Sequence, residues 1–228
     1  MIMNPSLACG NLLCLKEDID TLISVGAQML HMDVMDGHYV PNLCFSADTV
    51  RAVAAYCDAL IEVHLMTDKP DDYIKQMHEA GADMLSFHID ATRFPVSLLR
   101  RIKSLGMQAG IVLNPNTNHD DVESILEFVD FVNIMGVEPG FPGQQMLLEH
   151  TRRHISYLHE MRKTKGYSYR IMVDGGVNID NARICIAVGV DILVAGALAI
   201  YGQTESLKTC AERFMFLDAR SEERRVGK

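Results

Sequence analysis

The chain of 228 residues contains 48% hydrophobic and 22% charged residues, which is close to the average of globular proteins. Its length suits one α/β barrel, or one ordinary domain with a small second one. The formal net charge of −9, with no long stripe of Lys and Arg, argues against nucleic acid and against an anionic membrane surface as partners. A phosphorylated small molecule is still compatible, because backbone N–H groups can bind an anion in an acidic protein.

The cysteines and the apolar segments indicate the compartment. None of the six cysteines forms a C-x-x-C pair, which in a domain of this size indicates reduced thiols and not a disulfide framework. No apolar run approaches the length of a membrane span. The N-terminus lacks the charged region and apolar core of a signal peptide. We therefore expect a soluble cytoplasmic protein.

Strand-like runs alternate with helical patterns along the chain, which is typical of a parallel sheet with crossover helices. The predicted strands cover residues 2–8, 29–34, 59–65, 84–89, 108–113, 131–135, 169–173 and 191–195. The predicted helices cover residues 14–24, 46–57, a segment after Pro70, 95–105, a short 120–128, 146–163, 180–188 and 205–217.

Eight strand–helix units in this length predict an α/β fold with a single domain, a (β/α)8 TIM barrel over residues 1–219. The alternative is an open doubly wound sheet, which is disfavoured because no Gly-x-Gly-x-x-Gly follows the first strand. Residues 220–228 are mostly charged, and we expect a disordered tail there without a function.

Polar residues at the carboxyl ends of barrel strands converge on one mouth. His31 and Asp33 lie two positions apart and therefore share one face of the second strand, while His64 and Asp174 end the third and seventh. Two imidazoles and two carboxylates suit Zn²⁺, Fe²⁺ or Mn²⁺ better than Ca²⁺ or Mg²⁺. Taken alone, a histidine in an apolar strand such as His64 is more often a hydrogen-bonded core residue than a metal ligand. The four together predict one divalent metal ion per chain.

Glycine-rich loops follow the last three predicted strands. Backbone N–H groups in such loops bind anions, and the loops after strands 7 and 8 are the usual phosphate site of this fold. The alternative is that these are tight strand-to-helix turns without a ligand. The candidate phosphate-binding residues are Gly140, Phe141, Pro142, Gly143, Gly175, Gly176, Gly196 and Ala197.

Several of these motifs occur together, and in the same order, in one known family. The segment His-x-Asp-Val-Met-Asp-Gly-His-x-Val-Pro-Asn is highly specific, and the chain resembles the ribulose-phosphate 3-epimerase family. The matching stretches span nearly the whole chain: Pro5-Ser6-Leu7, 31–42, 63–66, Val112-Leu113-Asn114-Pro115, 137–144, 173–176 and 194–196.

The resemblance implies an isomerase of the pentose phosphate pathway that converts D-ribulose 5-phosphate into D-xylulose 5-phosphate. It implies a divalent metal held by His31, Asp33, His64 and Asp174, with Asp33 and Asp174 as the two acid/base residues. Protons would leave and return on opposite faces of C3 through a metal-stabilised enediolate. Ser6 and His64 would contact the substrate, and the glycine loops would hold the sugar phosphate. A homo-oligomer is implied by the resemblance alone.

Departures from the family pattern leave the substrate open. Gly136 stands where the family usually has Thr, and Ala197 stands where it usually has Ser. The segment 7–11 resembles the branch that epimerises D-allulose 6-phosphate to D-fructose 6-phosphate. A sugar-phosphate decarboxylase or aldolase is disfavoured because no predicted strand ends in Lys. A non-catalytic sugar-phosphate-binding barrel is disfavoured because both Asp33 and Asp174 are present.

Overall fold

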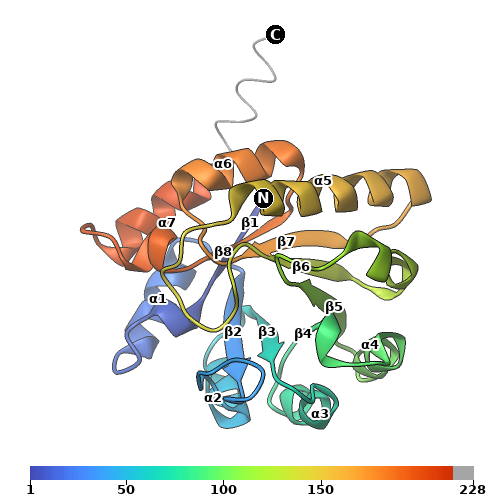
Figure 1. Ribbon diagram of the computed structural model, residues 1–228. Helices are drawn as coiled ribbons and strands as arrows, with labels where there is room; N and C mark the ends of the chain where they lie inside the picture. The colour runs from blue at the N-terminus through green and yellow to red at the C-terminus, as the bar shows by residue number, and fades with distance from the viewer. Residues whose placement is uncertain (218–228) are drawn as a thin grey trace.

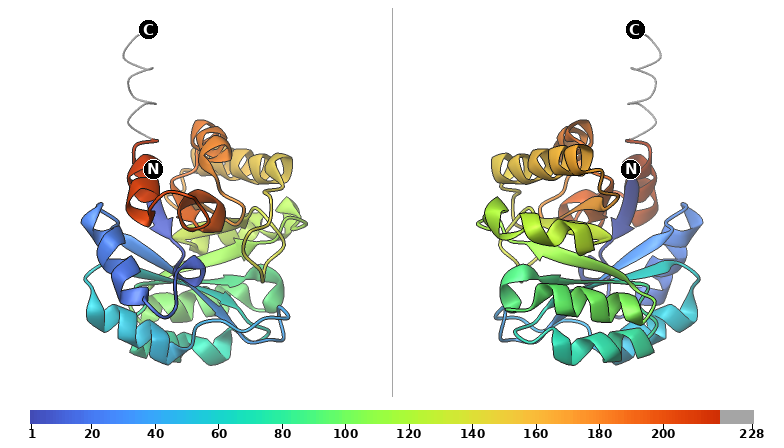
Figure 2. Two further views of the ribbon diagram at one scale, coloured as in Figure 1. Left: turned by 90° about the vertical axis from the view of Figure 1, so that its left-hand side faces the viewer. Right: turned by 90° about the vertical axis from the view of Figure 1, so that its right-hand side faces the viewer.

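The computed structural model describes residues 1–217, in which eight parallel strands form a nearly closed barrel surrounded by helices (Figure 1; side views in Figure 2). The order around the sheet is β1-β8-β7-β6-β5-β4-β3-β2, and an isolated bridge between Ser6 and His31 joins the β1 and β2 edges. The (β/α)8 barrel is therefore confirmed. The strands are β1 Ile2–Pro5, β2 Met29–Met35, β3 Leu60–Met66, β4 Met84–His88, β5 Gln108–Leu113, β6 Phe131–Met135, β7 Arg170–Asp174 and β8 Ile192–Ala195. The tail expected at 220–228 lies outside the described residues.

Local signals explain where several helices begin and end. The Ser46 side chain accepts a hydrogen bond from the Thr49 N–H at the start of α2, and Asn178 forms a capping box with Asn181 at the start of α6. Gly166 adopts the left-handed conformation that ends α5. The helices are α1 Leu15–Ser24, α2 Ala47–Tyr56, α3 Asp71–Glu79, α4 Pro95–Ser104, α5 Leu148–Lys165, α6 Ile179–Val188 and α7 Leu207–Met215. No helix among residues 1–217 is long and apolar enough to cross a membrane.

Two predicted elements differ from the structure. The first strand ends at Pro5, and residues 7–9 form a 3₁₀ turn in which Cys9 N–H donates to the Ser6 carbonyl. The predicted helix at 120–128 is instead two 3₁₀ segments, η3 His119–Asp121 and η4 Glu123–Phe128. Val122 lies between the two segments, and it is buried together with Ile125 and Leu126 of η4.

The inside of the barrel is largely apolar at the end opposite its mouth. A large cluster of buried apolar residues packs between the sheet and the helices, and a smaller one fills the barrel itself. Since side chains alternate along a strand, Met29 points inward like His31 and Asp33, and Met172 points inward like Asp174. The polar side chains at the strand ends therefore lie above a layer of buried apolar side chains. That smaller cluster consists of Met29, Met84, Phe131, Met172, Ile192 and Val194.

Gly136 allows the loops after β6 and β7 to approach closely. A Cβ atom at this position would lie 2.4 Å from the Gly175 carbonyl oxygen, so the backbone as it stands has no room for a side chain. This contact accounts for glycine at the position where the resemblance leads one to expect Thr.

We therefore expect Gly136→Thr to lower the free energy of unfolding by about 1–3 kcal/mol, the usual range for overpacking a tight site. Chemical denaturation followed by circular dichroism measures this change. An unaltered denaturation midpoint would contradict the close approach of the two loops.

Candidate active site and metal centre

Strands β2, β3 and β7 bring together the four residues predicted as metal ligands. His31 Nε2 lies 3.1 Å from Asp33 Oδ1 and 3.4 Å from Asp174 Oδ2. His64 Nδ1 lies 3.3 Å from the same oxygen of Asp33 and 3.2 Å from that of Asp174. Parallel pairing sets part of this geometry, because Asp33 is directly opposite His64 across β2 and β3.

The donor set and its spacing fit a metal ion. One ligand atom from each of the four residues lies within 4.8 Å of all the others. Atoms bound at about 2.0–2.1 Å to one tetrahedral ion are about 3.3 Å apart, which agrees with the N···O separations here. His64 Nδ1 is buried and makes no hydrogen bond of normal geometry among residues 1–217, so it is free to act as a ligand. The four residues can therefore hold one divalent cation.

Glu62 fixes the orientation of His31. Its fully buried carboxylate accepts a hydrogen bond from His31 Nδ1, and further bonds from Asn4 Nδ2 at 3.1 Å and Ser86 Oγ at 3.2 Å. When His31 is neutral and keeps its proton on Nδ1, its lone pair is on Nε2, the atom that faces the two aspartates. A carboxylate behind a ligating histidine is a common arrangement that sets its tautomer and raises its basicity.

Charge balance determines the protonation of the four residues. Burial alone would lower the pKa of His31, but the carboxylates of Asp33, Glu62 and Asp174 raise it well above its usual value. Burial also acts to lower the pKa of His64, but the carboxylates of Asp174 and Asp33 at 3.2 and 3.3 Å from its Nδ1 raise it to about 9. Burial would raise the pKa of both aspartates, but His31 and His64 lower that of Asp33 and bring that of Asp174 to about 2.

A second buried histidine contacts His64 from behind. His88 Nε2 lies 2.9 Å from His64 Nε2, and the His88 ring lies 4.5 Å from the Tyr39 ring between centroids. Burial and the neighbouring His64 hold the pKa of His88 well below its usual value, so this imidazole is neutral.

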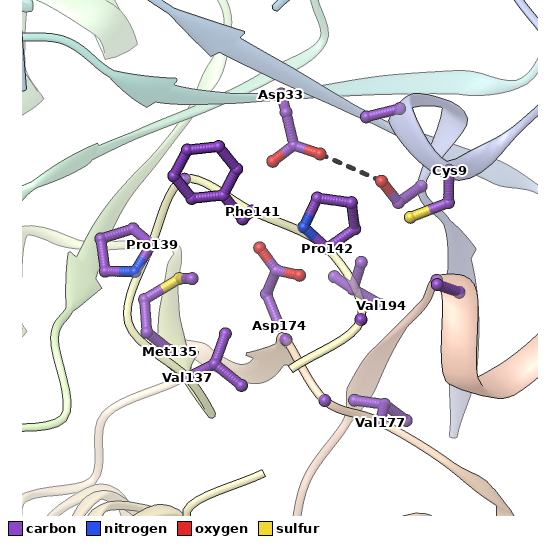
Figure 3. Close-up of a pocket in the computed structure, with 18 of the residues that line it drawn as sticks. Cys9, Asp33, Met135, Val137, Pro139, Phe141, Pro142, Asp174, Val177 and Val194 are labelled. Atoms are coloured by element: carbon purple, nitrogen blue, oxygen red, sulfur yellow. Dashed lines mark hydrogen bonds between the residues drawn. The ribbon is translucent and has the colours of Figure 1, made fainter. Parts of the chain in front are cut away.

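A cavity at the barrel mouth brings most of the predicted substrate-binding residues together. Asp33 and Asp174 point into it from opposite sides (Figure 3), and the Ser6 hydroxyl donates to Asp33 Oδ2 at 3.0 Å. His31 and His64 are fully buried behind these carboxylates and do not line the cavity. The lining includes Gly140, Phe141, Pro142, Gly143, Gly175, Gly176, Gly196 and Ala197, together with Met35, Met66 and Met135.

The loop after β7 offers the clearest anion-binding backbone. Gly175 and Gly176 have φ values of 92° and 68°, a conformation that only glycine adopts readily. Neither N–H group donates to an acceptor within residues 1–217. The residues lining the cavity include no Lys or Arg, so an anion held here would depend on backbone N–H groups.

The loop after β6 covers the cavity. Phe141 and Pro142 cross in front of the two aspartates in Figure 3. The Asn42 side-chain amide donates to the Gly140 carbonyl at 2.8 Å and holds this loop against the segment that follows β2. The remaining cavity volume of about 80 Å³ has room for about three water molecules.

The fold and these side chains define a (β/α)8 barrel protein with residues at its mouth that can hold one metal ion. A model of the ribulose-phosphate 3-epimerase family matches residues 2–201. The chain is 40% identical to ribulose-phosphate 3-epimerase of Treponema pallidum over 203 residues, which is 89% of this chain and 93% of that one. It is 38% identical to the Bacillus subtilis enzyme of the same name, over 91% of this chain and 95% of that one. The chain belongs to the ribulose-phosphate 3-epimerase family.

Solved structures of more distant proteins share the fold. A structure described as native KDPGal has a TM-score of 0.68 at 14% identity and covers 98% of this chain and 97% of its own. A 3-hexulose-6-phosphate synthase has a TM-score of 0.67 at 15% identity, over 95% of this chain and 99% of its own. At these identities the likeness supports the barrel architecture alone.

The strand-end pattern of the sequence did not indicate a role for Glu62 or His88. Glu62 lies two residues before His64, so strand alternation alone places both on the inward face of β3. A carboxylate at an inward strand position with no basic residue beside it in sequence is costly to bury unless it is hydrogen-bonded, and that cost could have identified it. His88 ends β4 in the same way that His64 lies near the end of β3.

The raised pKa of His64 predicts how the metal-free protein responds to pH. A histidine with a pKa of about 9 when folded and 6.5 when unfolded holds its proton more tightly in the folded state. Its contribution to stability is complete below pH 6.5 and is lost as the pH rises through 9. We expect the thermal unfolding midpoint, measured in excess chelator, to fall between pH 6.5 and 8.5.

The variant His64→Gln provides the matched comparison, because it lacks the titrating group and should show a shallower fall over the same pH range. A midpoint of the unaltered protein that stays level or rises would show that the two imidazoles are not charged beside the aspartates.

Proposed function

We propose that this protein catalyses the epimerisation of D-ribulose 5-phosphate to D-xylulose 5-phosphate by proton transfer at C3. The observation that carries the proposal is the pair of carboxylates, Asp33 and Asp174, that point into one cavity from opposite sides. Inverting a carbon next to a carbonyl requires a proton to leave one face and another to arrive on the opposite face. Two carboxylates from well-separated strands can serve these two faces.

The chain holds each carboxylate in a defined position. Ser6 donates to Oδ2 of Asp33, which leaves Oδ1 facing the two imidazoles. Asp174 is at the end of β7, and its Oδ2 faces both His31 Nε2 and His64 Nδ1. A divalent cation held by these four residues supplies a Lewis acid that stabilises negative charge on oxygen. One aspartate would then remove the C3 proton, and the other, after taking up a proton from solvent, would donate it to the opposite face.

The rest of the cavity suits a small sugar phosphate. The free N–H groups of Gly175 and Gly176, with those of the loops at 140–143 and 196–197, are proposed to bind the phosphate. Met35, Met66 and Met135 line the wall of the cavity and are proposed to keep water from the reacting carbon. Closure of the 138–143 loop over the bound substrate would complete that enclosure.

Finer properties are part of the same proposal. We propose Zn²⁺, Fe²⁺ or Mn²⁺ as the ion, since all three accept mixed imidazole and carboxylate ligands. We propose a homo-oligomer in the cytoplasm. Six free cysteines are compatible with a reducing compartment, and Leu13 is 95% exposed on the surface of the single chain.

A comparison of two substrates tests the reaction. We expect kcat/KM for ribulose 5-phosphate to exceed that for allulose 6-phosphate by about 10–200-fold, the usual effect of one additional carbon in a fitted pocket. Chelation should abolish the activity, and one equivalent of metal per chain should restore it. The opposite preference would assign the chain to hexulose phosphates. Full activity in metal-free protein, or no activity on either sugar, would contradict the proposed mechanism.

Replacing one aspartate tests the two-base scheme. Asp174→Asn should lower turnover by about 10²–10⁴-fold, because one face of C3 loses its acid/base group. The variant should exchange at most one face with solvent, as followed by deuterium incorporation into each epimer. Metal content is measured in parallel, so that loss of the ion is distinguished from loss of the base. Turnover near the unaltered rate with metal bound would contradict the scheme.

A further inference from the structure

A set of polar side chains extends from the buried His64 away from the cavity, through His88 and Asn114, which are also buried, to the half-buried Tyr39 and the exposed Asp90. His64 Nε2 contacts His88 Nε2 at 2.9 Å. Beyond His88, the Asn114 side-chain amide donates to Tyr39 Oη at 2.7 Å and to Asp90 Oδ2 at 3.1 Å. Tyr39 Oη donates to Asp90 Oδ1 at 2.9 Å. The set therefore ends on a carboxylate.

The sheet places Asn114 beside His88. His88 pairs with Val112 across β4 and β5, and Asn114 follows two positions later on the same face. His88 Nδ1 and Asn114 Oδ1 are both buried without a hydrogen-bond partner of normal geometry among residues 1–217. The Asn114 side chain nevertheless lies close enough to act on the His88 ring. His88 Nδ1, when it carries a proton, is therefore available to donate a hydrogen bond to Asn114 Oδ1.

Once His64 binds an ion through Nδ1, each hydrogen bond from His64 to Asp90 can have its donor on one side only. If His64 binds an ion through Nδ1, its remaining proton is on Nε2, because a neutral imidazole has one N–H. His88 Nε2 must then accept that proton, which places the His88 proton on Nδ1, where Asn114 Oδ1 can accept it. The Asn114 amide is left to donate to Tyr39 and Asp90, as the structure shows.

We propose that His88 and Asn114 are positioning residues that fix the tautomer and ring orientation of His64 through this oriented set of hydrogen bonds ending at Asp90. His31 receives the same support from one residue, because Glu62 accepts its Nδ1 proton directly. The inference rests on the proposed metal site. It adds residues that contact neither the ion nor the cavity.

A purely structural role for His88 makes a different prediction. A Phe at this position keeps a ring against Tyr39 and fills similar space, but it cannot accept the His64 proton. A Gln at this position carries a carbonyl that can reach the place of Nε2 and accept it. Packing alone would make His88→Phe the milder change, whereas the proposed hydrogen bonds make His88→Gln the milder one.

The test measures metal affinity by competition with a chromogenic chelator, using Zn²⁺ as the probe. We expect His88→Phe to weaken Zn²⁺ binding by about 10–100-fold, the usual range for removing the partner of a ligating histidine. His88→Gln should recover most of that loss. Tyr169→Phe is the matched control, because it removes a buried hydroxyl that donates to the Leu158 carbonyl at 2.7 Å, far from the site. It should change the unfolding midpoint but not the Zn²⁺ affinity.

A second measurement uses the unaltered protein and needs no variant to fold. Long-range ¹H–¹⁵N correlations of the Zn²⁺-loaded protein, with ¹⁵N-labelled histidine, should show His88 protonated on Nδ1 and His64 protonated on Nε2. His88 protonated on Nε2, or equal Zn²⁺ affinity in His88→Phe and the unaltered protein, would overturn the inference and leave the proposed function intact. Failure of the unaltered protein to bind Zn²⁺, Fe²⁺ or Mn²⁺ would overturn both.

Discussion

The site depends on the burial of two carboxylates against two imidazoles at the mouth of the barrel. Buried charges are costly unless each meets an opposite charge at close range. Here four N···O separations of 3.1–3.4 Å supply that compensation. Without metal, the raised pKa values of His31 and His64 place two positive charges beside Asp33 and Asp174. A divalent cation with two neutral imidazoles carries the same total charge, so the site is electrostatically matched to such an ion in both states.

The barrel makes this concentration of charge possible. Parallel strands deliver their carboxyl ends to one edge, and closing the sheet brings β2, β3 and β7 around a common axis. The bridge between Ser6 and His31 joins the β1 and β2 edges directly at the site, so closure of the barrel and placement of the first ligand depend on the same contact. Below this polar layer the interior is filled by apolar side chains, which keep water away from the buried charges.

Much of this arrangement could be predicted from the sequence, because strand alternation and strand-end position are local properties. Those two rules were sufficient to select His31, Asp33, His64 and Asp174. The same rules would have found Glu62, but its partners Asn4 and Ser86 come from other strands, so its role depends on three-dimensional neighbours.

The structure of the connecting loops could not be predicted from strand alternation or from local sequence patterns. The connection at 119–128 forms two 3₁₀ segments although its buried apolar residues Val122, Ile125 and Leu126 have the spacing of an α-helix, so the apolar pattern alone predicted the wrong helix type. The cover that Phe141 and Pro142 form over the cavity depends on the Asn42 side chain, about 100 positions earlier in the chain. No pattern within the 138–143 loop indicates that contact.

His31 is oriented by a carboxylate, Glu62, whereas His64 is oriented by a neutral side chain, His88. The negative charge already present at the site explains this difference. Asp33, Asp174 and Glu62 already place three carboxylates around one position. A fourth carboxylate directly against His64 would add negative charge where the substrate also becomes negative when its proton leaves. The neutral side chains of His88 and Asn114 instead orient His64 while keeping Asp90 beyond them. Because the interaction of charges falls with distance, this arrangement fixes the ring with less electrostatic opposition to the reaction.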